Sequence, residues 1–291
     1  MSELPLIAVI VPAKNRPAFL ARLVDSVKRQ RGVRTELVVV DDGSDPPLGG
    51  LGEGVTVVRN AESRGACASR NRGLEVSRAD VVTFFDDDAE LGSDDVLARS
   101  YAWLVKRPRA AAVGFRQTDA HGATRGVNPG SGGEPRLAPL FYTYGCMVRR
   151  KVFEELGGFA EPFFYYYEEM ELSLRILDAG YDIVYDPDLA VIHHESEVGR
   201  DWKRISRLTL RNALLTVLLR YPGHLLAPGI ARAVYNSHRA FGWRIGLDLG
   251  GKSGAAWEVL RLWRYALSER RPIAARTLLR YRSLGRTPPA A

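Results

Sequence analysis

Three consecutive carboxylates stand at the end of an apolar run in the segment VVTFFDDDAEL, residues 81–91. The residues before Asp86, Asp87 and Asp88 (the acidic triplet) suit a buried β-strand. Adjacent carboxylates repel one another, so such a cluster needs a cation, a helix N-terminus or open water to offset the repulsion. Taken alone, the triplet fits a divalent metal site and a solvated acidic turn equally well.

Strand and helix patterns alternate along the first half of the chain. Strands are expected over residues 6–11, 36–42, 55–60 and 81–85, and helices over residues 18–30 and 66–78. This order predicts an α/β fold with a doubly wound, mostly parallel, Rossmann-like sheet. Ligands bind beyond the carboxyl ends of the strands in such sheets. Asn15, Asp41, Asp42 and the acidic triplet all fall at that edge.

A second group of chemically active residues lies between residues 165 and 194. The segment YYYEEMELSLRILDAGY (165–181) predicts a helix whose first turn carries Glu168, Glu169 and Glu171. Carboxylates in a first turn stabilise a helix by themselves, but three behind an aromatic run exceed what the helix dipole needs. The strand expected next delivers a histidine pair, His193 and His194, to a sheet edge. Such histidines are either structural or metal ligands.

Composition limits the class of protein. The 291 residues, 46% hydrophobic and 26% charged, are typical of a globular protein. Cys67 and Cys146 have no metal-ligand or CxxC spacing, which fits a reducing, cytoplasmic compartment. The N-terminus lacks the pattern of a signal peptide. No apolar stretch reaches the ~18–20 residues that a membrane-spanning helix needs.

The net charge of +7 is unevenly distributed. Residues 200–291 contain 18 Lys or Arg and 4 Asp or Glu, a net charge of +14, which leaves −7 for residues 1–199. We therefore expect an acidic sheet domain over residues 1–200 and a basic helical C-terminal region over residues 201–291. No nucleic-acid-binding motif is recognisable, and the acidic body argues against a nucleic-acid partner.

The C-terminal region is expected to contain helices over residues 201–221 and 255–271. Arg204, Arg207 and Arg211 share one face of the first helix. Three tryptophans accompany this basic surface: Trp202, Trp257 and Trp263. The combination fits an anionic membrane surface, to which each nearby Lys or Arg contributes ~1 kcal/mol. A helical appendage packed on the body with a solvated basic face is the alternative.

Six segments resemble the family-2 inverting glycosyltransferases with the GT-A fold, especially bacterial rhamnosyltransferase-like members. They are VIVPAKNR (9–16), VVVDDGS (38–44), NAESRGACASRNRGL (60–74), FFDDDAEL (84–91), GGFAEPFFYYYEEMELSLR (157–175) and VIHH (191–194). Each segment alone is weak, whereas their order and spacing over about residues 5–200 are specific. The resemblance implies a nucleotide-sugar-binding catalytic domain over residues 1–200.

The resemblance also implies a donor site. Asp42 would accept a hydrogen bond from the base, and a carboxylate suits the imide N–H of uracil or thymine, so a UDP- or dTDP-sugar is expected. Arg64 would lie near the base and the pyrophosphate. The residues expected to bind the nucleotide sugar are Pro12, Lys14, Arg16, Asp41, Asp42, Arg64, Asp86 and Asp87.

Asp86 and Asp88 match the DxD motif of the family. The resemblance therefore implies Mn²⁺ or Mg²⁺ held by Asp88, Asp86 and His193, with Asp87 near the donor ribose and His194 as the next candidate ligand. A histidine ligand would favour Mn²⁺ over Mg²⁺.

The family usually carries Glu-Asp where this chain has Glu168-Glu169. Glu169 aligns with the expected catalytic base, and Glu168 is the substitute because glutamate reaches roughly one methylene further than aspartate. The base would take the proton of the acceptor hydroxyl while the metal stabilises the departing nucleoside diphosphate. Inversion follows from this single displacement.

The implied activity is transfer of a hexosyl or deoxyhexosyl group to a cell-envelope glycan or lipid-linked acceptor. The segment RNALLTVLLRYP (211–222) resembles one found in members that use lipid-linked acceptors, which implies a cytoplasmic protein peripheral to the inner membrane face. Without a QxxRW motif, addition of one sugar or a few is expected. The oligomeric state is not predicted.

Two other functions compete with this expectation. A catalytically silent GT-A domain that acts as a membrane-peripheral nucleotide- or glycan-binding scaffold is the main alternative, because of the change at Glu169. A nucleotidyltransferase would need a glycine-rich loop after the first strand, which VPAKNRPAF does not provide.

Overall fold

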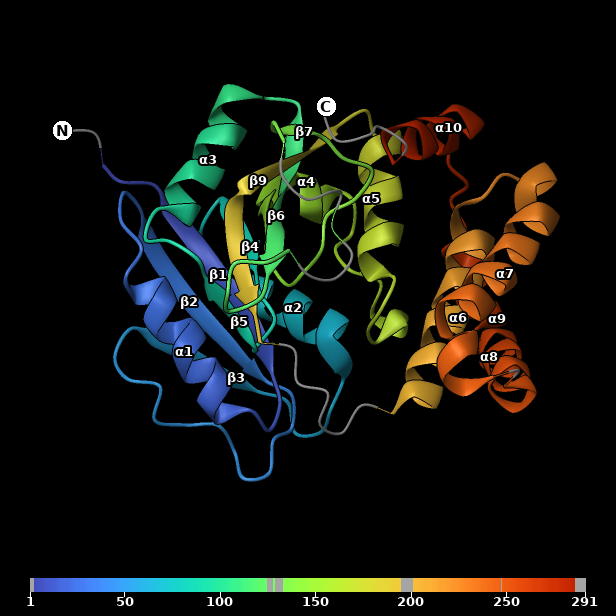
Figure 1. The fold of residues 1–291 in the computed structure, drawn as a ribbon, viewed down its shortest axis with the longest axis horizontal. Coiled ribbons are helices and arrows are strands. Elements are labelled where there is room, and N and C mark those ends of the chain that lie inside the picture. Colours follow the sequence, from blue (N-terminus) through green and yellow to red (C-terminus); the bar gives the residue numbers. More distant parts are fainter. Residues whose placement is uncertain (1–2, 125–127, 129–132, 195–200, 247, 286–291) are drawn as a thin grey trace.

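Runs rich in valine, isoleucine and alanine form a single sheet in the computed structural model, which describes residues 3–124, 128, 133–194, 201–246 and 248–285 (Figure 1). Nine strands of these ranges follow the order β3-β2-β1-β4-β8-β6-β9-β5, and β7 pairs with β9. They are β1 (Leu6–Ala13), β2 (Arg34–Asp41), β3 (Val55–Arg59), β4 (Val81–Phe84), β5 (Ala89–Leu91), β6 (Ala110–Thr118), β7 (Arg136–Leu137), β8 (Cys146–Arg149) and β9 (Asp182–His193).

Parallel pairing brings the chemically active strand ends to one edge. β3, β2, β1 and β4 are mutually parallel neighbours, and β6 is parallel to β9. In the register, Ala13 of β1 lies opposite Asp41 of β2. β8 runs antiparallel between β4 and β6. The α/β fold with a doubly wound, mostly parallel sheet is therefore confirmed.

Helices bury both faces of the sheet (Figure 1). They are α1 (Pro17–Lys28), α2 (Gly65–Val76), α3 (Val96–Lys106), α4 (Arg150–Glu155) and α5 (Glu168–Asp178). Successive side chains of a strand point to opposite faces. Ala8 and Ile10 of β1 accordingly join the core cluster that includes residues of α2 and α5, whereas Ile7 and Val9 join the cluster of α1 and α3. Apolar burial on both sides explains why the strands read as continuous apolar runs.

The helical C-terminal region lies beyond α5, away from the sheet (Figure 1). It comprises α6 (Trp202–Arg220), α7 (Leu226–Ile245), α8 (Leu249–Arg261), α9 (Trp263–Ser268) and α10 (Ala275–Leu284). The pattern over residues 255–271 is divided between α8 and α9, which meet at Leu262. Leu215 and Leu219 of α6 belong to the same buried cluster as Leu172 of α5. A domain boundary at residue 200 stays a prediction, since α6 continues the core of the sheet domain.

One of the three arginines on the basic face expected for α6 is buried, and the other two are exposed. Arg211 is only 9% exposed, and its guanidinium lies 3.4 Å from the carboxylate of Glu258 on α8. Arg207 lies 3.3 Å from the same carboxylate. The expectation of a solvated basic face is therefore wrong at Arg211, because α8 packs against it, whereas Arg204 and Arg207 are exposed. Within the described ranges, no helix is both long and apolar enough to span a bilayer.

Candidate active site

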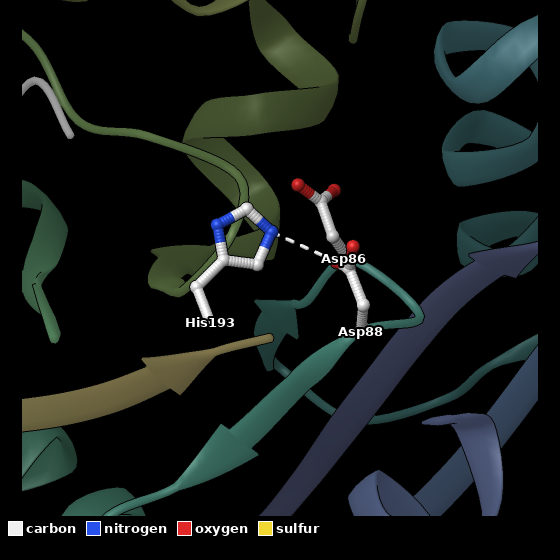
Figure 2. Close-up of side chains that lie close together, drawn as sticks. All are labelled: Asp86, Asp88 and His193. Atoms are coloured by element: carbon white, nitrogen blue, oxygen red, sulfur yellow. Dashed lines mark hydrogen bonds and ion pairs between the residues drawn. The ribbon is translucent and has the colours of Figure 1, made fainter. Parts of the chain in front are cut away.

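The acidic triplet occupies the turn between β4 and β5. β5 pairs antiparallel with β9, and the register sets Ala89 opposite His193, so the imidazole lies beside the triplet. Figure 2 shows His193 facing Asp86 and Asp88. One ligand atom of each of the three side chains lies within 4.8 Å of the others. Two carboxylates and an imidazole form a donor set that fits Mn²⁺ or Mg²⁺, and the histidine favours Mn²⁺.

The carboxylates of the triplet differ in their electrostatic environment. Asp88 Oδ1 is 2.8 Å from His193 Nε2, and Arg16 donates to Asp88 Oδ2 at 2.9 Å. Burial opposes ionisation of Asp88, but its hydrogen bond to His193 and the charges of His193 and Arg16 hold its pKa below the usual value. Burial raises the pKa of Asp87 to about 7, against the effect of Arg16. Asp88 is therefore ionised over a wider pH range than Asp87.

The segment that follows the first strand donates hydrogen bonds to the triplet from the Arg16 guanidinium and from the Lys14 backbone. Arg16 also donates to Asp87 Oδ1 at 3.2 Å, and the backbone N–H of Lys14 donates to Asp87 Oδ2 at 3.2 Å. Arg16 and the backbone of Lys14 therefore lie beside the triplet, and their binding of a nucleotide sugar stays a prediction. Pro12 lies two residues before Lys14, in β1, opposite Val40.

His194 is not directed at the triplet. Its Nε2 lies 2.9 Å from Glu90 Oε2, and its ring packs near Phe19 with centroids 6.1 Å apart. Its backbone N–H does reach the triplet, donating to the carbonyl of Asp88 at 2.9 Å. The His194 imidazole is therefore paired with Glu90, and its role as an additional metal ligand stays a prediction.

The carboxylates of Asp41 and Asp42 accept hydrogen bonds from neighbouring loops and from the start of α2. Asp42 accepts five hydrogen bonds at 2.6–3.0 Å, from Asn60 Nδ2, Ser63 Oγ, Ser69 Oγ and the backbone N–H groups of Arg64 and Gly65 at the start of α2. A carboxylate offers about four lone-pair sites, so these donors saturate it. Asp41 accepts from the backbone N–H groups of Ser44 and Leu48 and from Arg59. A contact between Asp42 and a nucleotide base stays a prediction that requires one of these donors to move.

The hydrogen-bond partners of Arg64 are Glu161 and Asp42, not the acidic triplet. Its guanidinium donates to Glu161 Oε2 at 2.9 Å, in a pair in which both side chains are about half exposed. Its backbone N–H donates to the Asp42 carboxylate. A role of Arg64 at the pyrophosphate therefore stays a prediction.

Arg70 of α2 joins the triplet to α5, and the sequence patterns did not single it out. Its side chain is 3% exposed and donates to Asp86 Oδ1 at 2.7 Å and to Glu168 Oε1 at 2.8 Å. Burial opposes the charge of Arg70, but Asp86 and Glu168 raise its pKa above the ordinary value. Among the described residues, Arg70 Nε and Glu168 Oε2 are buried without a hydrogen-bond partner.

Replacing Arg70 by methionine should destabilise the fold. The change leaves the carboxylate of Glu168 buried without its cation, and breaking one partner of a buried pair costs about 3–5 kcal/mol. We expect the free energy of unfolding, measured by urea titration, to fall by about that amount. Arg78→Met, at an exposed arginine just after α2, is the matched control and should change it by less than about 0.5 kcal/mol. Equal losses in the two variants would contradict a buried charge network at Arg70.

The two glutamates at the start of α5 have different surroundings. Glu168 is 3% exposed, and burial together with the charge of Glu169 raises its pKa to about 8, despite Arg70. Glu169 is half-buried, and its Oε1 accepts from Thr143 Oγ1 at 2.9 Å. Glu168 thus supports Arg70, whereas Glu169 keeps an accessible carboxylate held in one orientation by Thr143.

Residues 8–157, just over half of the chain, match the family model described as Glycosyl transferase family 2. The chain belongs to this family. A family 2 relative, the pre-mycofactocin glycosyltransferase of Mycobacterium tuberculosis, is 28% identical over 216 residues, which cover 67% of this chain and 44% of that protein. The O-antigen chain rhamnosyltransferase RfbN of Salmonella typhimurium is 26% identical over 217 residues, covering 67% of this chain and 68% of that protein.

A solved structure confirms the fold expected for family 2. The mannosyltransferase PcManGT from Pyrobaculum calidifontis, in complex with GDP-Man and Mn²⁺, superposes with a TM-score of 0.59 at 20% sequence identity. The match covers 98% of this chain and 85% of that one. The chain therefore has a GT-A fold, although it spans less than half the length of its mycobacterial relative.

Proposed function

We propose that the chain is a metal-dependent inverting glycosyltransferase that moves a sugar from a UDP- or dTDP-sugar to a hydroxyl of a cell-envelope glycan or lipid-linked acceptor. The observation that carries the proposal is the convergence of Asp86, Asp88 and His193 at the edge of the sheet where ligands bind. Family membership supports it, as does the rhamnosyltransferase RfbN, whose name places it in O-antigen synthesis.

Asp86, Asp88 and His193 would hold Mn²⁺ or Mg²⁺, which when bound supplies positive charge next to a departing diphosphate. Glu169 accepts the proton of the acceptor hydroxyl as that oxygen forms its bond to the anomeric carbon. The bond from this carbon to the diphosphate breaks in the same step, which inverts the configuration. Thr143 fixes the direction of the Glu169 carboxylate before the acceptor arrives.

Glu169 is a better base than Glu168. Glu168 is 3% exposed, so an acceptor hydroxyl cannot reach its carboxyl group. Its Oε1 is also engaged by Arg70. Glu169 accepts from Thr143 through one oxygen and is half-buried, so an acceptor hydroxyl can reach it.

Calorimetric binding of UDP, dTDP and GDP, each with Mn²⁺, Mg²⁺ or EDTA, tests the donor and metal together. We expect a pyrimidine diphosphate to bind only with a divalent cation, and Mn²⁺ to support tighter binding than Mg²⁺. Preference for GDP would overturn the pyrimidine assignment and leave the metal role intact. Absence of binding for all three nucleotides would replace the transferase proposal by the silent scaffold. Release of nucleoside diphosphate from the matching sugar nucleotide then tests turnover.

We further propose that α8 and α9 contact an anionic membrane surface. An apolar stripe at helical spacing runs along them, and its large side chains are 56–65% exposed: Leu249, Trp257, Leu260, Trp263 and Leu267. Arg261 and Arg264 are exposed beside the stripe. Tryptophans place an apolar ring and a polar edge at the level of lipid headgroups, where arginines meet anionic lipids. Trp257 and Trp263 are two of the three tryptophans that the sequence associated with a membrane-facing surface.

Replacing Trp257 and Trp263 by serine should weaken binding to vesicles of phosphatidylcholine with about 30% phosphatidylglycerol by at least about tenfold, or about 1.4 kcal/mol. Vesicle co-sedimentation measures the partition. Val105→Ser removes a side chain of similar exposure (62%) from α3 of the sheet domain and should have no effect. Wild-type binding by the double tryptophan variant would rule out this surface.

A further inference from the structure

The loop before α5 has an unusual backbone. In the segment 159–167 (the aromatic loop), Phe164, Tyr166 and Tyr167 have positive φ values of 65°, 73° and 68°. Residues with side chains adopt this left-handed conformation only when surrounding contacts hold them there. The loop runs directly into Glu168 and Glu169, so whatever holds its backbone also sets the start of α5.

Two adjacent residues of α6 provide these contacts. Asn212, fully buried, donates from Nδ2 to the carbonyls of Phe163, Tyr165 and Tyr166 at 2.9, 3.0 and 2.7 Å. Arg211 donates to the carbonyls of Pro162 and Phe163 at 3.0 and 2.7 Å. Arg211 and Asn212 therefore make five hydrogen bonds to carbonyl groups of the aromatic loop. The backbone conformation of the loop leaves these carbonyls without the partners that a regular helix or strand would provide.

The orientation of the Asn212 amide is itself determined. Arg211 Nε donates to Asn212 Oδ1 at 2.8 Å, and a guanidinium N–H can only donate. The amide oxygen must therefore face Arg211, which leaves the NH₂ group to face the three carbonyls. The pair forms a single unit in which one residue orients the other.

The opposite side of the aromatic loop is fixed by α2. The backbone N–H of Cys67 donates to the carbonyl of Phe164 at 3.2 Å, and a Cβ at Gly65 would lie 2.6 Å from that oxygen. The loop also contacts the arginine that joins the triplet to α5, because the Arg70 guanidinium lies 5.5 Å from the centre of the Phe159 ring. The loop is thus held between α2 and α6 and connects the donor edge with the base.

We propose that Arg211 and Asn212 are positioning residues for sugar transfer: through the aromatic loop they place the Glu169 carboxylate and the ring of Tyr165 at the acceptor side. This inference rests on the proposed function. α6 also contacts the start of α5 directly. Arg220 of α6 donates to the carboxylate of Glu171, in the first turn of α5, at 2.5 Å. Both residues of the pair lie outside the part of the chain, residues 8–157, that matches the family model.

The first test variant is Asn212→Asp, which keeps the size of the side chain but turns a carboxylate oxygen toward three carbonyls. The second is Arg211→Lys, which keeps the positive charge but removes the planar guanidinium that donates to several acceptors at once. The control is Thr216→Val, another buried position of α6, whose hydroxyl donates only within the helix, to the carbonyl of Asn212 at 2.8 Å. We expect kcat to fall at least about 100-fold in Asn212→Asp and at least about tenfold in Arg211→Lys. Affinity for nucleotide with Mn²⁺ should stay within about threefold of wild type, and Thr216→Val should retain kcat.

Amide hydrogen exchange of residues 163–169 separates this inference from the proposed function. Exchange should be faster in Asn212→Asp and Arg211→Lys than in Thr216→Val, whether or not a sugar nucleotide is turned over. Unchanged exchange and unchanged kcat in a folded Arg211→Lys would overturn the positioning role. A parallel loss of nucleotide affinity in both variants would also overturn it, because it would show general damage to the fold. If the wild-type protein transfers no sugar while hydrogen exchange in the variants responds as expected, the proposed function fails. The conclusion that Arg211 and Asn212 hold the aromatic loop then remains valid.

Discussion

Asp88→Asn is expected to lower kcat/KM for sugar transfer at least about 10³-fold, which corresponds to about 4 kcal/mol of transition-state stabilisation. Asp88 is 4% exposed, and its carboxylate contacts His193 and Arg16 at 2.8 and 2.9 Å. The amide removes the charge that would bind a divalent cation while keeping the shape of the side chain. Nucleotide affinity should at the same time lose its dependence on Mn²⁺. Steady-state kinetics and calorimetry in Mn²⁺ and in EDTA measure the two effects.

Asp94→Asn is the matched control for this substitution. Asp94 follows β5, the short strand that Asp88 precedes, and its carboxylate makes long surface pairs with Arg29 and Arg31, at 3.7 and 3.8 Å. Its kinetics and its Mn²⁺ dependence should equal those of wild type. A wild-type response to Mn²⁺ in Asp88→Asn would remove the acidic triplet from the reaction.

Glu169→Gln should lower kcat by about 10²–10⁴-fold, the usual contribution of a positioned general base. The glutamine can still accept from Thr143 through its carbonyl oxygen, so the geometry is retained and only the basic group is lost. Affinity for nucleotide with metal should therefore be unchanged. Single-turnover measurements at saturating donor and acceptor isolate the chemical step.

Glu168→Gln is the contrasting variant. Glu168 is buried, and glutamine can still accept from Arg70 through its carbonyl oxygen, so we expect kcat to fall less than about tenfold. A large loss in Glu168→Gln with a small loss in Glu169→Gln would exchange the two assignments. Loss of nucleotide affinity in Glu169→Gln would place that residue at the donor instead.

Local patterns predicted the parts of the site that depend on single strands. The runs ending in Asp42 and in the acidic triplet identified two strands and the edge where they end, because a continuous apolar run that stops at polar residues is typical of a buried strand. The family resemblance added His193, whose place beside Asp88 depends on a pairing of β5 with β9 across about a hundred residues. No local pattern contains that register.

The burial of Arg70 and of Arg211 was not predicted from the sequence, and the reason is the same for both residues. Arg70 reads as one more exposed arginine of a helix, but its partner Glu168 is 98 positions away in sequence. Arg211 belongs to a regular basic face on the helical wheel, yet its own side chain is covered by α8 and by the aromatic loop. A buried charge is recognisable only when the element that buries it is known.

The sheet order has a consequence for synthesis on the ribosome. β5 pairs only with β9 among the described strands, so a strand made near residue 90 waits for one completed near residue 193 before it has a neighbour. Until then the nascent chain carries the acidic triplet on an unpaired edge, with its histidine partner not yet translated. Long-range pairing of this kind is slow and leaves intermediates exposed. The cluster of Asp86, Asp88 and His193 is thus completed only when β9 enters the sheet, so its formation marks the point at which the sheet is finished.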